Sequence, residues 1–504
     1  MEKPVERLVI VGGGSAGFLA ALSFRLYLPR IHVVVVHSAD IPVIGVGEST
    51  TQGFVDYLHK ALRIDRGEFL REVRPSWKLG LRMEWGDPAD THFNYPFEQF
   101  LALNAPNLER VQAFYCLDGM SDSSPYGAMM DRGLAPCRIQ NGRLAVDPRA
   151  AYHIPNQRFI DYLQRKVKEY RGEVVGGEIV EVNRHDSGNV KSIQLKDGRE
   201  IEGDFFVDCS GFKSLLLKET MGAKFVSYGD ALSCDAAVIG SWQRPADDAD
   251  VHPYTTAETM AHGWCWQIDF VDSVTRGYVF STAYCSPDEA MRELKERNPK
   301  LGDDLRVIRF PSGRYDRYWV GNVAGVGNAS GFVEPLEATA LHLIVTQCWS
   351  LIGALRDSGG SPSEVLKAIE NRRYATVWDD VRDFLALHYR FNRRMDTPFW
   401  RHCRENTPLG GAEELVSAYA EAGPAVSLGS LIPTDSIFGY PGYINLLVGQ
   451  RVPTRVRAQL NENEFRHWQT HCQRVREAIK PALPVKEALL RAYEECRSWP
   501  KEGI

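Results

Sequence analysis

The stretch Leu8-Val9-Ile10-Val11-Gly12-Gly13-Gly14-Ser15-Ala16-Gly17 decides the fold of this chain. Its four apolar residues predict a strand, its glycines a tight turn, and the apolar run that follows suits a helix. Gly12 permits the turn, Gly14 lets the backbone approach a pyrophosphate, and Gly17 lets helix and strand pack closely. The backbone amides of Ser15 and Ala16, at the start of the helix, are then expected to bind the phosphates. The sequence therefore predicts an α/β fold that binds a dinucleotide.

The second apolar run, residues 31–36, ends in His37 and Ser38. An acidic residue usually stands at this point to bind the ribose hydroxyl groups, so the chain departs from the dinucleotide fingerprint. Two interpretations of His37 stay open, namely contact with the ribose and an ordinary surface histidine.

Two later glycine turns favour a flavin over a nicotinamide cofactor. Residues 204–211 are typical of an apolar strand that leads to a glycine turn, a pattern common in FAD proteins, and residues 319–327 repeat the theme. From about Glu337 the apolar residues recur at helical spacing, so a second helix N-terminus is expected to point into the site. No other GxGxxG follows a strand, which gives no sign of an NAD(P)H domain.

Lys78 lies in a stretch of strict alternation. Because a period of two is typical of a β-strand, residues 77–85 are predicted to form one. A lysine on the polar face of a strand is usually just solvated. The presence of Glu337 and of the glycine-rich N-terminus makes Lys78 a candidate catalytic residue. The apolar side of the stretch carries Trp77, Leu79, Leu81, Met83 and Trp85.

The composition is typical of a soluble enzyme. The 504 residues suffice for large cores and two modules. A net charge of −6 and a pI near 6.2 argue against a nucleic acid as partner. The apolar runs are too short for a membrane span, and the N-terminus lacks the apolar core of a signal peptide. The ten cysteines show no CxxC pairs or histidine clusters, so we expect no disulfides, no metal site and a cytoplasmic location.

The patterns divide the chain into two modules. Strands and glycine turns occupy residues 1–88 and 143–355, the expected FAD-binding module. Residues 89–142, rich in aromatic residues, prolines and methionines, are expected to cover a pocket, and residues 356–504 carry mainly helical patterns. The fold class is therefore α/β, with a Rossmann-like module of mixed sheets and a mainly helical substrate-binding module. An aromatic-lined cavity and ordinary core packing are both open for Trp264, Trp266, Phe97, Phe399 and Trp400.

Nine segments of the chain can be compared with known families: 12–17, 41–48, 77–80, 151–153, 208–212, 263–268, 331–337, 396–400 and 447–450. Together they resemble the flavin-dependent tryptophan halogenases, and the resemblance runs along most of the chain. Several matches in the same order over about 450 residues are far more specific than any one of them.

The resemblance implies a GR2-type FAD-binding "box" and a helical "pyramid", with FAD acting as FADH2, O2 and a halide ion as further reactants, and a separate NAD(P)H-dependent flavin reductase as partner. It implies catalytic roles for Lys78 and Glu337 and a halide held near the backbone of Thr339 and Ala340. The implied cofactor contacts are Gly12, Gly14, Ser15, Ala16, Gly17, His37, Gly47, Glu48, Asp208, Gly327 and Leu336, and the implied substrate contacts are Tyr95, Pro96, Phe97 and Trp400.

The chemistry implied by this resemblance gives both catalytic candidates a task. Reduced FAD and oxygen give a flavin hydroperoxide, which halide attack converts to hypohalous acid. Lys78 then either hydrogen-bonds the hypohalous acid or forms a haloamine, and the sequence does not choose between them. Glu337 stabilises the cationic ring intermediate or removes its proton. Without such a role, Glu337 is a carboxylate stabilised by a helix N-terminus.

The chain departs from the family pattern at four positions. Asp269 ends a box that ends in proline elsewhere, Ala338 stands where serine is frequent, Ala340 replaces a glycine, and Tyr95 stands where a histidine often lines the tryptophan pocket. We therefore expect an electron-rich aromatic substrate of indole type other than free tryptophan. Because Ala340 crowds the halide position, we expect bromide to react better than chloride.

Two alternative functions remain. One alternative is an aromatic hydroxylase that transfers oxygen instead of halogen. Asp269 favours it, because the resemblance implies that the box that ends in proline elsewhere suppresses monooxygenation. A flavin-binding protein without turnover gains weight from Ala338 and Ala340. The sequence also leaves open whether two copies form a homodimer.

Overall fold

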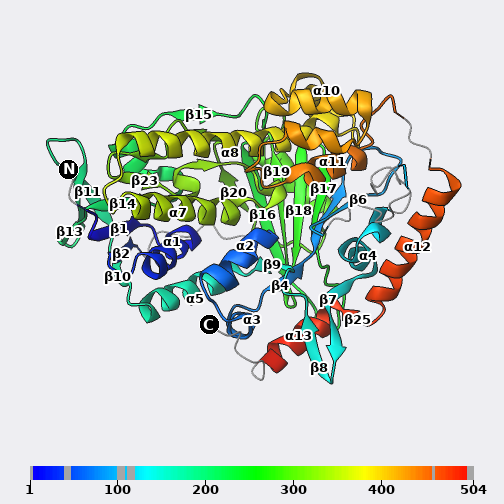
Figure 1. The fold of residues 1–504 in the computed structure, drawn as a ribbon, viewed down its shortest axis with the longest axis horizontal. Coiled ribbons are helices and arrows are strands. Elements are labelled where there is room, and N and C mark those ends of the chain that lie inside the picture. Colours follow the sequence, from blue (N-terminus) through cyan, green and yellow to red (C-terminus); the bar gives the residue numbers. More distant parts are fainter. Residues whose placement is uncertain (1–3, 39–46, 99–107, 110–119, 457–459, 497–504) are drawn as a thin grey trace.

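The computed structural model of the chain describes residues 4–38, 47–98, 108–109, 120–456 and 460–496. Of the segments that carry the family resemblance, 41–46 lies outside these residues. The two largest sheets of the described residues have six and seven strands. In Figure 1 the strands β1 and β2 of the first lie near the N-terminus, and β16, β18 and β19 of the second lie at the centre of the molecule. One large cluster of buried apolar side chains runs from the first strand to the C-terminal helices.

The six-stranded sheet has the order β10-β2-β1-β14-β23-β22, and all its pairs are parallel except β22–β23. Its central strands are runs of buried apolar residues, as a sheet covered on both faces requires. The predicted strands at residues 8–11 and 31–36 are confirmed to within one residue at each end. The strands are β1 (Arg7–Val11), β2 (His32–His37), β10 (Glu173–Gly176), β14 (Phe205–Asp208), β22 (Trp319–Val320) and β23 (Val323–Gly325).

The seven-stranded sheet has the order β20-β16-β19-β18-β17-β5-β6 and is antiparallel except for the pair β17–β5. Strand β6 comes from the segment after residue 88, so the edge of this sheet carries residues from both sides of the expected module boundary. The strands are β5 (Gly80–Glu84), β6 (Phe93–Pro96), β16 (Ala236–Gln243), β17 (Thr255–Met260), β18 (Gly263–Asp269), β19 (Ser273–Phe280) and β20 (Arg306–Arg309).

Four three-stranded sheets complete the β structure of the described residues. The sheet β3-β9-β4 matters most for the site, because it connects the residues after position 47 with Lys78. Its strands are β3 (Glu48–Ser49), β9 (Ala151–Ile154) and β4 (Ser76–Lys78). The other three sheets comprise β11 (Ile179–Arg184), β12 (Val190–Leu195) and β13 (Glu200–Glu202); β15 (Phe225–Ser227), β21 (Gly313–Tyr315) and β24 (Gly331–Phe332); and β25 (Ala482–Pro484), β7 (Leu134–Gln140) and β8 (Arg143–Val146).

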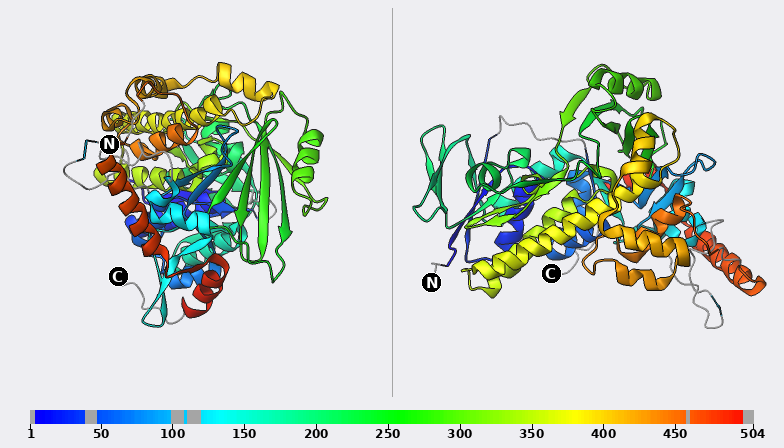
Figure 2. Two further views of the ribbon diagram at one scale, coloured as in Figure 1. Left: turned by 90° about the vertical axis from the view of Figure 1, so that its right-hand side faces the viewer. Right: turned by 90° about the horizontal axis from the view of Figure 1, so that it is seen from above.

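Helices pack beside the six-stranded sheet and fill the C-terminal half. Helix α1 (Ser15–Tyr27) packs against α5 (Asn156–Glu169) and α7 (Ala340–Asp357). The long helix α8 (Glu364–Phe391) runs across the molecule from the N-terminal side to the C-terminal helices, as Figure 2 shows. The remaining helices are α2 (Gln52–Asp56), α3 (Arg66–Val73), α4 (Pro125–Arg132), α6 (Pro287–Arg297), α9 (Pro398–Asn406), α10 (Glu413–Ala422), α11 (Gly439–Gly449), α12 (Glu462–Ile479) and α13 (Val485–Glu495).

Two sequence expectations about element boundaries are wrong. Residues 77–85 do not form one strand, because the chain changes sheets at Leu79: its N–H donates to the carbonyl of Pro253 and its carbonyl accepts from Phe97. The helix expected from Glu337 begins at Ala340, after a single 3₁₀ turn over Pro335–Glu337. Between the two, Ala338 adopts a left-handed conformation with φ of +56°, which a helix cannot contain.

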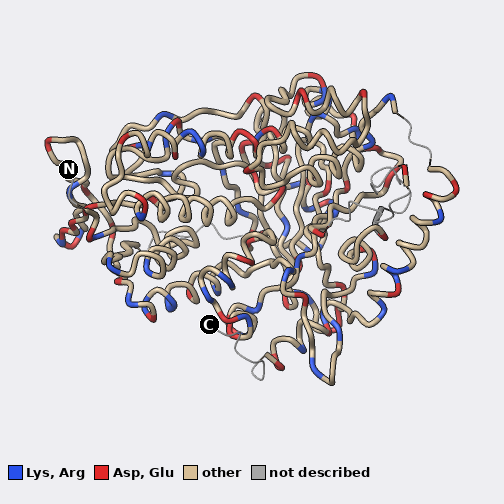
Figure 3. Tube along the Cα trace, viewed as in Figure 1, with Lys and Arg blue, Asp and Glu red and all other residues tan. Residues whose placement is uncertain are grey.

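Charged residues of both signs are spread over the molecule, and the described cysteines lie in its interior. In Figure 3, lysine and arginine are interspersed with aspartate and glutamate along the visible trace. The nine cysteines within the described residues are all buried. Among the described residues, none of the helices is long and apolar enough to cross a membrane.

Candidate active site

A cavity of about 830 Å³ lies between the six-stranded and the seven-stranded sheet. The turn after β1, the end of β2 and the first turn of α7 form one side, and Ala237, Trp266 and Val279 from β16, β18 and β19 form the other. Parallel strands with a glycine turn at their carboxyl ends are the usual place for a ligand in an open α/β sheet. The cavity is therefore the candidate cofactor site.

The glycine turn has the geometry that the sequence predicts. Gly12 has φ of +122°, and a Cβ there would lie 2.2 Å from the carbonyl oxygen of Cys209. A Cβ on Gly17 would lie 1.9 Å from the carbonyl oxygen of Gly12. A Cβ on Gly14 would meet nothing within 4 Å, because Gly14 faces the cavity. Gly12 and Gly17 are thus required for packing, while Gly14 leaves the backbone open to a ligand.

Two helix N-termini face the cavity. Ser15 and Ala16 open α1, Ala340 and Leu341 open α7, and Ala338 lies just before α7. All five line the cavity. The amides of a first helical turn lack partners within the helix and attract anions. The expected second helix N-terminus in the site is therefore present, and Thr339, its N-cap residue, is buried.

Two polar residues of the cavity bear on cofactor binding. His37 lines it at the end of β2, and burial together with the charge of Lys168 lowers the pKa of its imidazole. His37 is half-buried, and contact with the ribose stays a prediction. Burial raises the pKa of the Glu48 carboxyl to about 7, and the Asn156 side chain donates to it at 3.2 Å. Gly47, next to Glu48, also lines the cavity.

Three of the expected cofactor residues lie behind the cavity wall. Both carboxylate oxygens of Asp208 already accept hydrogen bonds, one from the N–H and hydroxyl of Ser210 and the other from the amides of Leu216 and Leu217. Asp208 therefore fixes the turn that lines the cavity, and direct contact with a ligand is not supported. A Cβ on Gly327 would lie 3.1 Å from the Cβ of Ala16, and Leu336 is buried in the core.

Lys78 is completely buried, in contrast to the solvated lysine that its strand position suggests. Its Nζ has no hydrogen-bond partner among the described residues and lies 4.9 Å from the ring centre of Phe97. Burial lowers the pKa of this amine to about 7, against the opposing attraction of Glu337. A buried amine that titrates near neutrality is typical of a functional lysine.

Strand pairing brings three of the expected substrate residues to Lys78. Gly80 pairs with Pro96 and Leu81 with Tyr95 across β5 and β6, and Phe97 follows directly. A Cβ on Gly80 would lie 2.2 Å from the carbonyl oxygen of Tyr95, so only glycine fits there. Burial, and then the charge of Glu337, raise the pKa of Tyr95 well above its ordinary value.

Glu337 has a partner that the sequence did not indicate. Its Oε1 lies 2.8 Å from Nε2 of His388 on α8, and both side chains are buried. His388 Nδ1 contacts the carbonyl oxygen of Phe384 at 3.1 Å, which holds the ring in place. The two residues are 51 positions apart, so no local pattern could have paired them.

Glu334, three residues before Glu337, is a second buried carboxyl group. One of its oxygens accepts from Trp264 Nε1 and from the Tyr389 hydroxyl, while the other has no partner among the described residues. Burial raises the pKa of Glu334 to about 7. Because Tyr389 and His388 are neighbours on α8, this helix holds both acids of the turn before α7.

The aromatic residues expected in a cavity are divided between two environments. Trp266 lines the cofactor cavity. Trp400 is fully buried, stacks on Tyr389 and donates from Nε1 to the carbonyl of Met260 at 2.7 Å. Its position is that of a core residue, and a role in substrate binding stays a prediction.

Comparison with known proteins agrees with this geometry. The family model described as tryptophan halogenase matches residues 7–464. Tryptophan 7-halogenase RebH of Lentzea aerocolonigenes is 31% identical over 452 residues, which are 85% of this chain and 84% of that protein. The structure of MibH, a lanthipeptide tryptophan 5-halogenase, superposes with a TM-score of 0.88 at 35% identity and covers 98% of this chain and 95% of MibH. That of Xcc4156, a flavin-dependent halogenase from Xanthomonas campestris, has a TM-score of 0.87 at 26% identity, with 97% of this chain and 99% of the other covered. The chain therefore belongs to the tryptophan halogenase family of flavin-dependent enzymes.

Proposed function

We propose that the protein is a FADH2-dependent halogenase that installs bromide or chloride on an electron-rich aromatic substrate of indole type. The observation that carries the proposal is the buried Lys78 amine, without a hydrogen-bond partner among the described residues, close to the Glu337 carboxylate. In the balanced reaction an aromatic C–H, a halide ion, O2, FADH2 and a proton give a carbon–halogen bond, FAD and two molecules of water.

The cavity fits FAD in size and in chemistry. Its volume of about 830 Å³ falls in the range of sites for ligands of cofactor size, and the open face of Gly14 beside the start of α1 suits a pyrophosphate. Ser15, Ala16, Gly47, Glu48 and His37 would contact the cofactor there. When bound as FADH2, FAD supplies the two-electron reduction of O2 through which the halide becomes hypohalous acid.

The first turn of α7 is the proposed halide site. The backbone amides near Thr339 and Ala340 carry the positive end of the helix dipole and face the cofactor cavity. The left-handed conformation of Ala338 sets the direction in which these amides point. The methyl group of Ala340 narrows the site, which favours bromide because bromide is less strongly hydrated and more easily oxidised than chloride.

Lys78 and Glu337 would act on the substrate side. Lys78 positions the electrophilic halogen, as a hydrogen-bond donor when protonated or as a haloamine when neutral, and a pKa near 7 makes both forms accessible. Glu337 stabilises the positive charge on the halogenated ring and accepts the proton that leaves it. His388 would keep the Glu337 carboxylate in one orientation.

The proposed substrate is an uncharged indole rather than free tryptophan. Tyr95 is buried beside Lys78 and Glu337, and a zwitterion in such a site needs paired charges of its own. Residues 405–430 show no clear match to the segment that binds the ammonium and carboxylate groups of an amino acid. Burial of unpaired charges costs several kcal/mol, so the neutral ring should be preferred.

An indole panel with added flavin reductase, FAD and either chloride or bromide tests the proposal by mass spectrometry. We expect halogenated products, more with bromide than with chloride, and a higher kcat/KM for indole or its neutral derivatives than for tryptophan. Hydroxylated products that do not depend on halide would instead support an aromatic hydroxylase, which Asp269 at the end of the Trp264–Ile268 box favours. FAD binding without any product would support a binding protein without turnover.

Three further expectations belong to the same proposal. A separate NAD(P)H-dependent flavin reductase is the expected partner, the division into a FAD-binding and a substrate-binding module is the expected domain organisation, and the cytoplasm is the expected location. A homodimer remains an open question of the proposal, which size-exclusion chromatography with light scattering addresses.

A further inference from the structure

The sheet β3-β9-β4 connects the cofactor cavity with Lys78. Ser49 on β3 lines the cavity, and Lys78 ends β4. Strand pairing places Ser49 opposite His153 and His153 opposite Ser76, so these three polar residues form one row across the sheet. Because alternate residues of a strand share a face, Ser76 and Lys78 lie on the same side as His153. His153 is fully buried.

Hydrogen bonds join this row into a chain. Ser49 Oγ lies 3.2 Å from Thr255 Oγ1, and Thr255 Oγ1 lies 2.8 Å from His153 Nε2. On the other side of the ring, His153 Nδ1 has a longer contact of 3.5 Å with Ser76 Oγ, which donates to the carbonyl oxygen of Asp269 at 2.5 Å. Thr255, like Ser49, lines the cofactor cavity.

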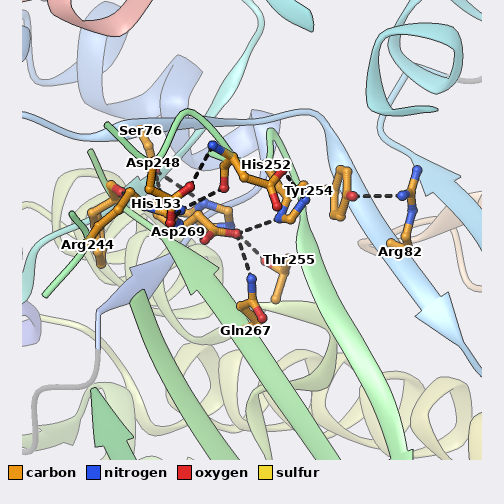
Figure 4. A network of polar contacts seen from close by, with 12 residues as sticks. Ser76, Arg82, His153, Arg244, Asp248, His252, Tyr254, Thr255, Gln267 and Asp269 are labelled. Carbon is orange, nitrogen blue, oxygen red and sulfur yellow. Dashed lines mark hydrogen bonds and ion pairs between the residues drawn. The ribbon is translucent and has the colours of Figure 1, made fainter. Parts of the chain in front are cut away.

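Asp269 fixes the far end of this series of hydrogen bonds, as Figure 4 shows. Its carboxylate is buried and accepts from Arg244 on one oxygen and from His252 and Gln267, each at 3.0 Å, on the other. The residue that departs from the proline of the family box is therefore held by three side chains. Its backbone carbonyl is a fixed acceptor for Ser76.

The direction of every hydrogen bond follows from that fixed acceptor. The single proton of the Ser76 hydroxyl points to Asp269, so Ser76 accepts from His153 and Nδ1 carries the ring proton. A neutral imidazole then has a bare Nε2, which accepts from the Thr255 hydroxyl, and Ser49 in turn donates to Thr255. Burial and the nearby charge of Lys78 keep the pKa of His153 well below its ordinary value, so the ring is uncharged.

A bare imidazole nitrogen beside the path of a halogenating oxidant is a chemical hazard. Its lone pair can attack hypohalous acid, forming an N–halogen bond and releasing hydroxide, and it thereby competes with the Lys78 amine. In this structure that lone pair is engaged by the Thr255 hydroxyl, whereas Lys78 Nζ has no partner among the described residues. The two nitrogens differ in availability although they lie close together.

We propose that Thr255 is a positioning residue that masks Nε2 of His153, so that halogen leaving the cofactor cavity reaches Lys78 instead of the histidine. The hydrogen bonds from His153 to Ser76 and from Ser76 to Asp269 hold the imidazole of His153 in the tautomer that Thr255 can mask. This inference rests on the proposed halogenase function and adds a residue that directs the halogen between the two sites.

Thr255→Val tests the mask, because it removes the hydroxyl group while nearly preserving the side-chain shape, and Thr255→Ser is the matched control that keeps the donor. We expect Thr255→Val to lower the yield of halogenated product per FADH2 oxidised about tenfold and to place halogen or oxygen on the peptide that contains His153, as tandem mass spectrometry detects. Thr255→Ser should stay within twofold of the wild type. A Thr255→Val enzyme with wild-type yield and an unmodified peptide overturns the proposal.

A double variant separates masking from a merely structural effect. If the loss arises from the unmasked nitrogen, His153→Gln combined with Thr255→Val abolishes the adduct and restores most of the yield, because the amide oxygen of glutamine is a weak nucleophile. A double variant as poor as Thr255→Val overturns the proposal. Ser76→Ala, which lies outside the cofactor cavity, releases the ring tautomer and should produce the same adduct even if Thr255→Val binds FAD weakly.

A challenge with added hypobromous acid keeps this proposal apart from the proposed function, because it needs no turnover. At equal dose we expect the His153 peptide of Thr255→Val to be modified at least about tenfold more than that of the wild type. Equal modification of the two proteins overturns the mask, whatever the wild type does with substrate. A wild type that yields no halogenated product would instead remove the proposed function, and with it the role of the mask in halogen transfer.

Discussion

At the scale of single residues, the site holds ionisable groups in environments that favour their uncharged forms. Burial moves the pKa of Lys78 down to about 7 and those of Glu48 and Glu334 up to about 7. Each group therefore changes charge near neutral pH, where neither a surface lysine nor a surface glutamate would. Buried charges without full hydrogen bonding lower stability, and such residues persist where function needs them.

Replacement of Lys78 by methionine should separate function from stability at one residue. Lys78→Met keeps the volume and removes the amine, so halogenation should fall by more than tenfold while FAD binding and the oxidation of FADH2 by O2 continue. A smaller loss, under about 1.4 kcal/mol of barrier, would make the lysine structural. Product and flavin oxidation are measured side by side, with the wild type as control.

The same variant should be more stable than the wild type, in a pH-dependent way. The folded pKa of Lys78 lies below the unfolded value. The buried charge therefore lowers the free energy of unfolding of the wild type most at pH 7 and below, and this destabilisation disappears as the pH rises toward 10. The advantage of Lys78→Met, on the order of a few kcal/mol, should thus shrink between pH 7 and pH 10. Urea unfolding at several pH values measures it, and a constant advantage would contradict the assigned pKa.

Glu334 predicts the opposite dependence on pH. Its folded pKa lies above the unfolded value, so the wild type loses stability as the pH rises from about 4.5 to about 7. Glu334→Gln mimics the protonated acid and should match the wild type near pH 5 but exceed it by on the order of a few kcal/mol at pH 8. Thermal unfolding at the two pH values is the measurement. Equal midpoints at pH 8 would show that water or another group relieves the buried charge.

At the scale of elements, the periodic and glycine-rich segments could be predicted and the contacts between distant elements could not. The turn from Gly12 to Gly17 was predictable because its glycines follow from local steric limits. A Cβ on Gly12 or Gly17 would clash with the nearby backbone. The break at Leu79 was not, because its cause is the hydrogen bonds to Pro253 and Phe97, which belong to other elements. The late start of α7 follows from the left-handed conformation of Ala338, which the sequence does not indicate because alanine rarely adopts it.

The candidate site divides in the same way. The family resemblance indicated Lys78 and Glu337 as a candidate pair. It indicated neither their burial nor the contact of Glu337 with His388. The polar row with His153 at its centre also depends on the register of three strands. Chemistry that resides in one motif is visible in a sequence, whereas chemistry that requires register is not.

Helix α7 carries the prediction about halide selectivity. Ala340 is exposed and lines the cofactor cavity at the first position of the helix, where its methyl group would limit the approach of a halide to the amides of the proposed site. Ala340→Gly should therefore raise chlorination relative to bromination, by several-fold, at equal halide concentrations. A matched control is Ala354→Gly in the same helix, which alters helix propensity far from the first turn. An unchanged chloride-to-bromide ratio would place the halide elsewhere.

At the scale of the whole molecule, the candidate cofactor cavity and the buried pair Lys78 and Glu337 occupy different places, as the proposed mechanism requires. The cofactor cavity lies between the two large sheets, and Lys78 and Glu337 lie on the side of β6 and α8. The sheet β3-β9-β4 joins the two places, so its residues would line any transfer between them under the proposed function. The fold recurs in MibH, with 98% of this chain and 95% of MibH covered.

The source of reducing equivalents is the last property to follow from the whole chain. One GxGxxG turn follows a strand, at Gly12 to Gly17, and the cavity beside it is large enough for one dinucleotide. The sequence contains no further GxGxxG after an apolar strand run, which is the usual sign of a separate nicotinamide-binding domain. The purified protein with FAD should therefore oxidise NADH or NADPH no faster than FAD alone, and rapid oxidation would contradict the prediction. Because FADH2 can diffuse, halogenation should also persist when reductase and protein are separated by a dialysis membrane that FAD crosses. Product that forms only when the two proteins mix would show that the flavin passes within a complex.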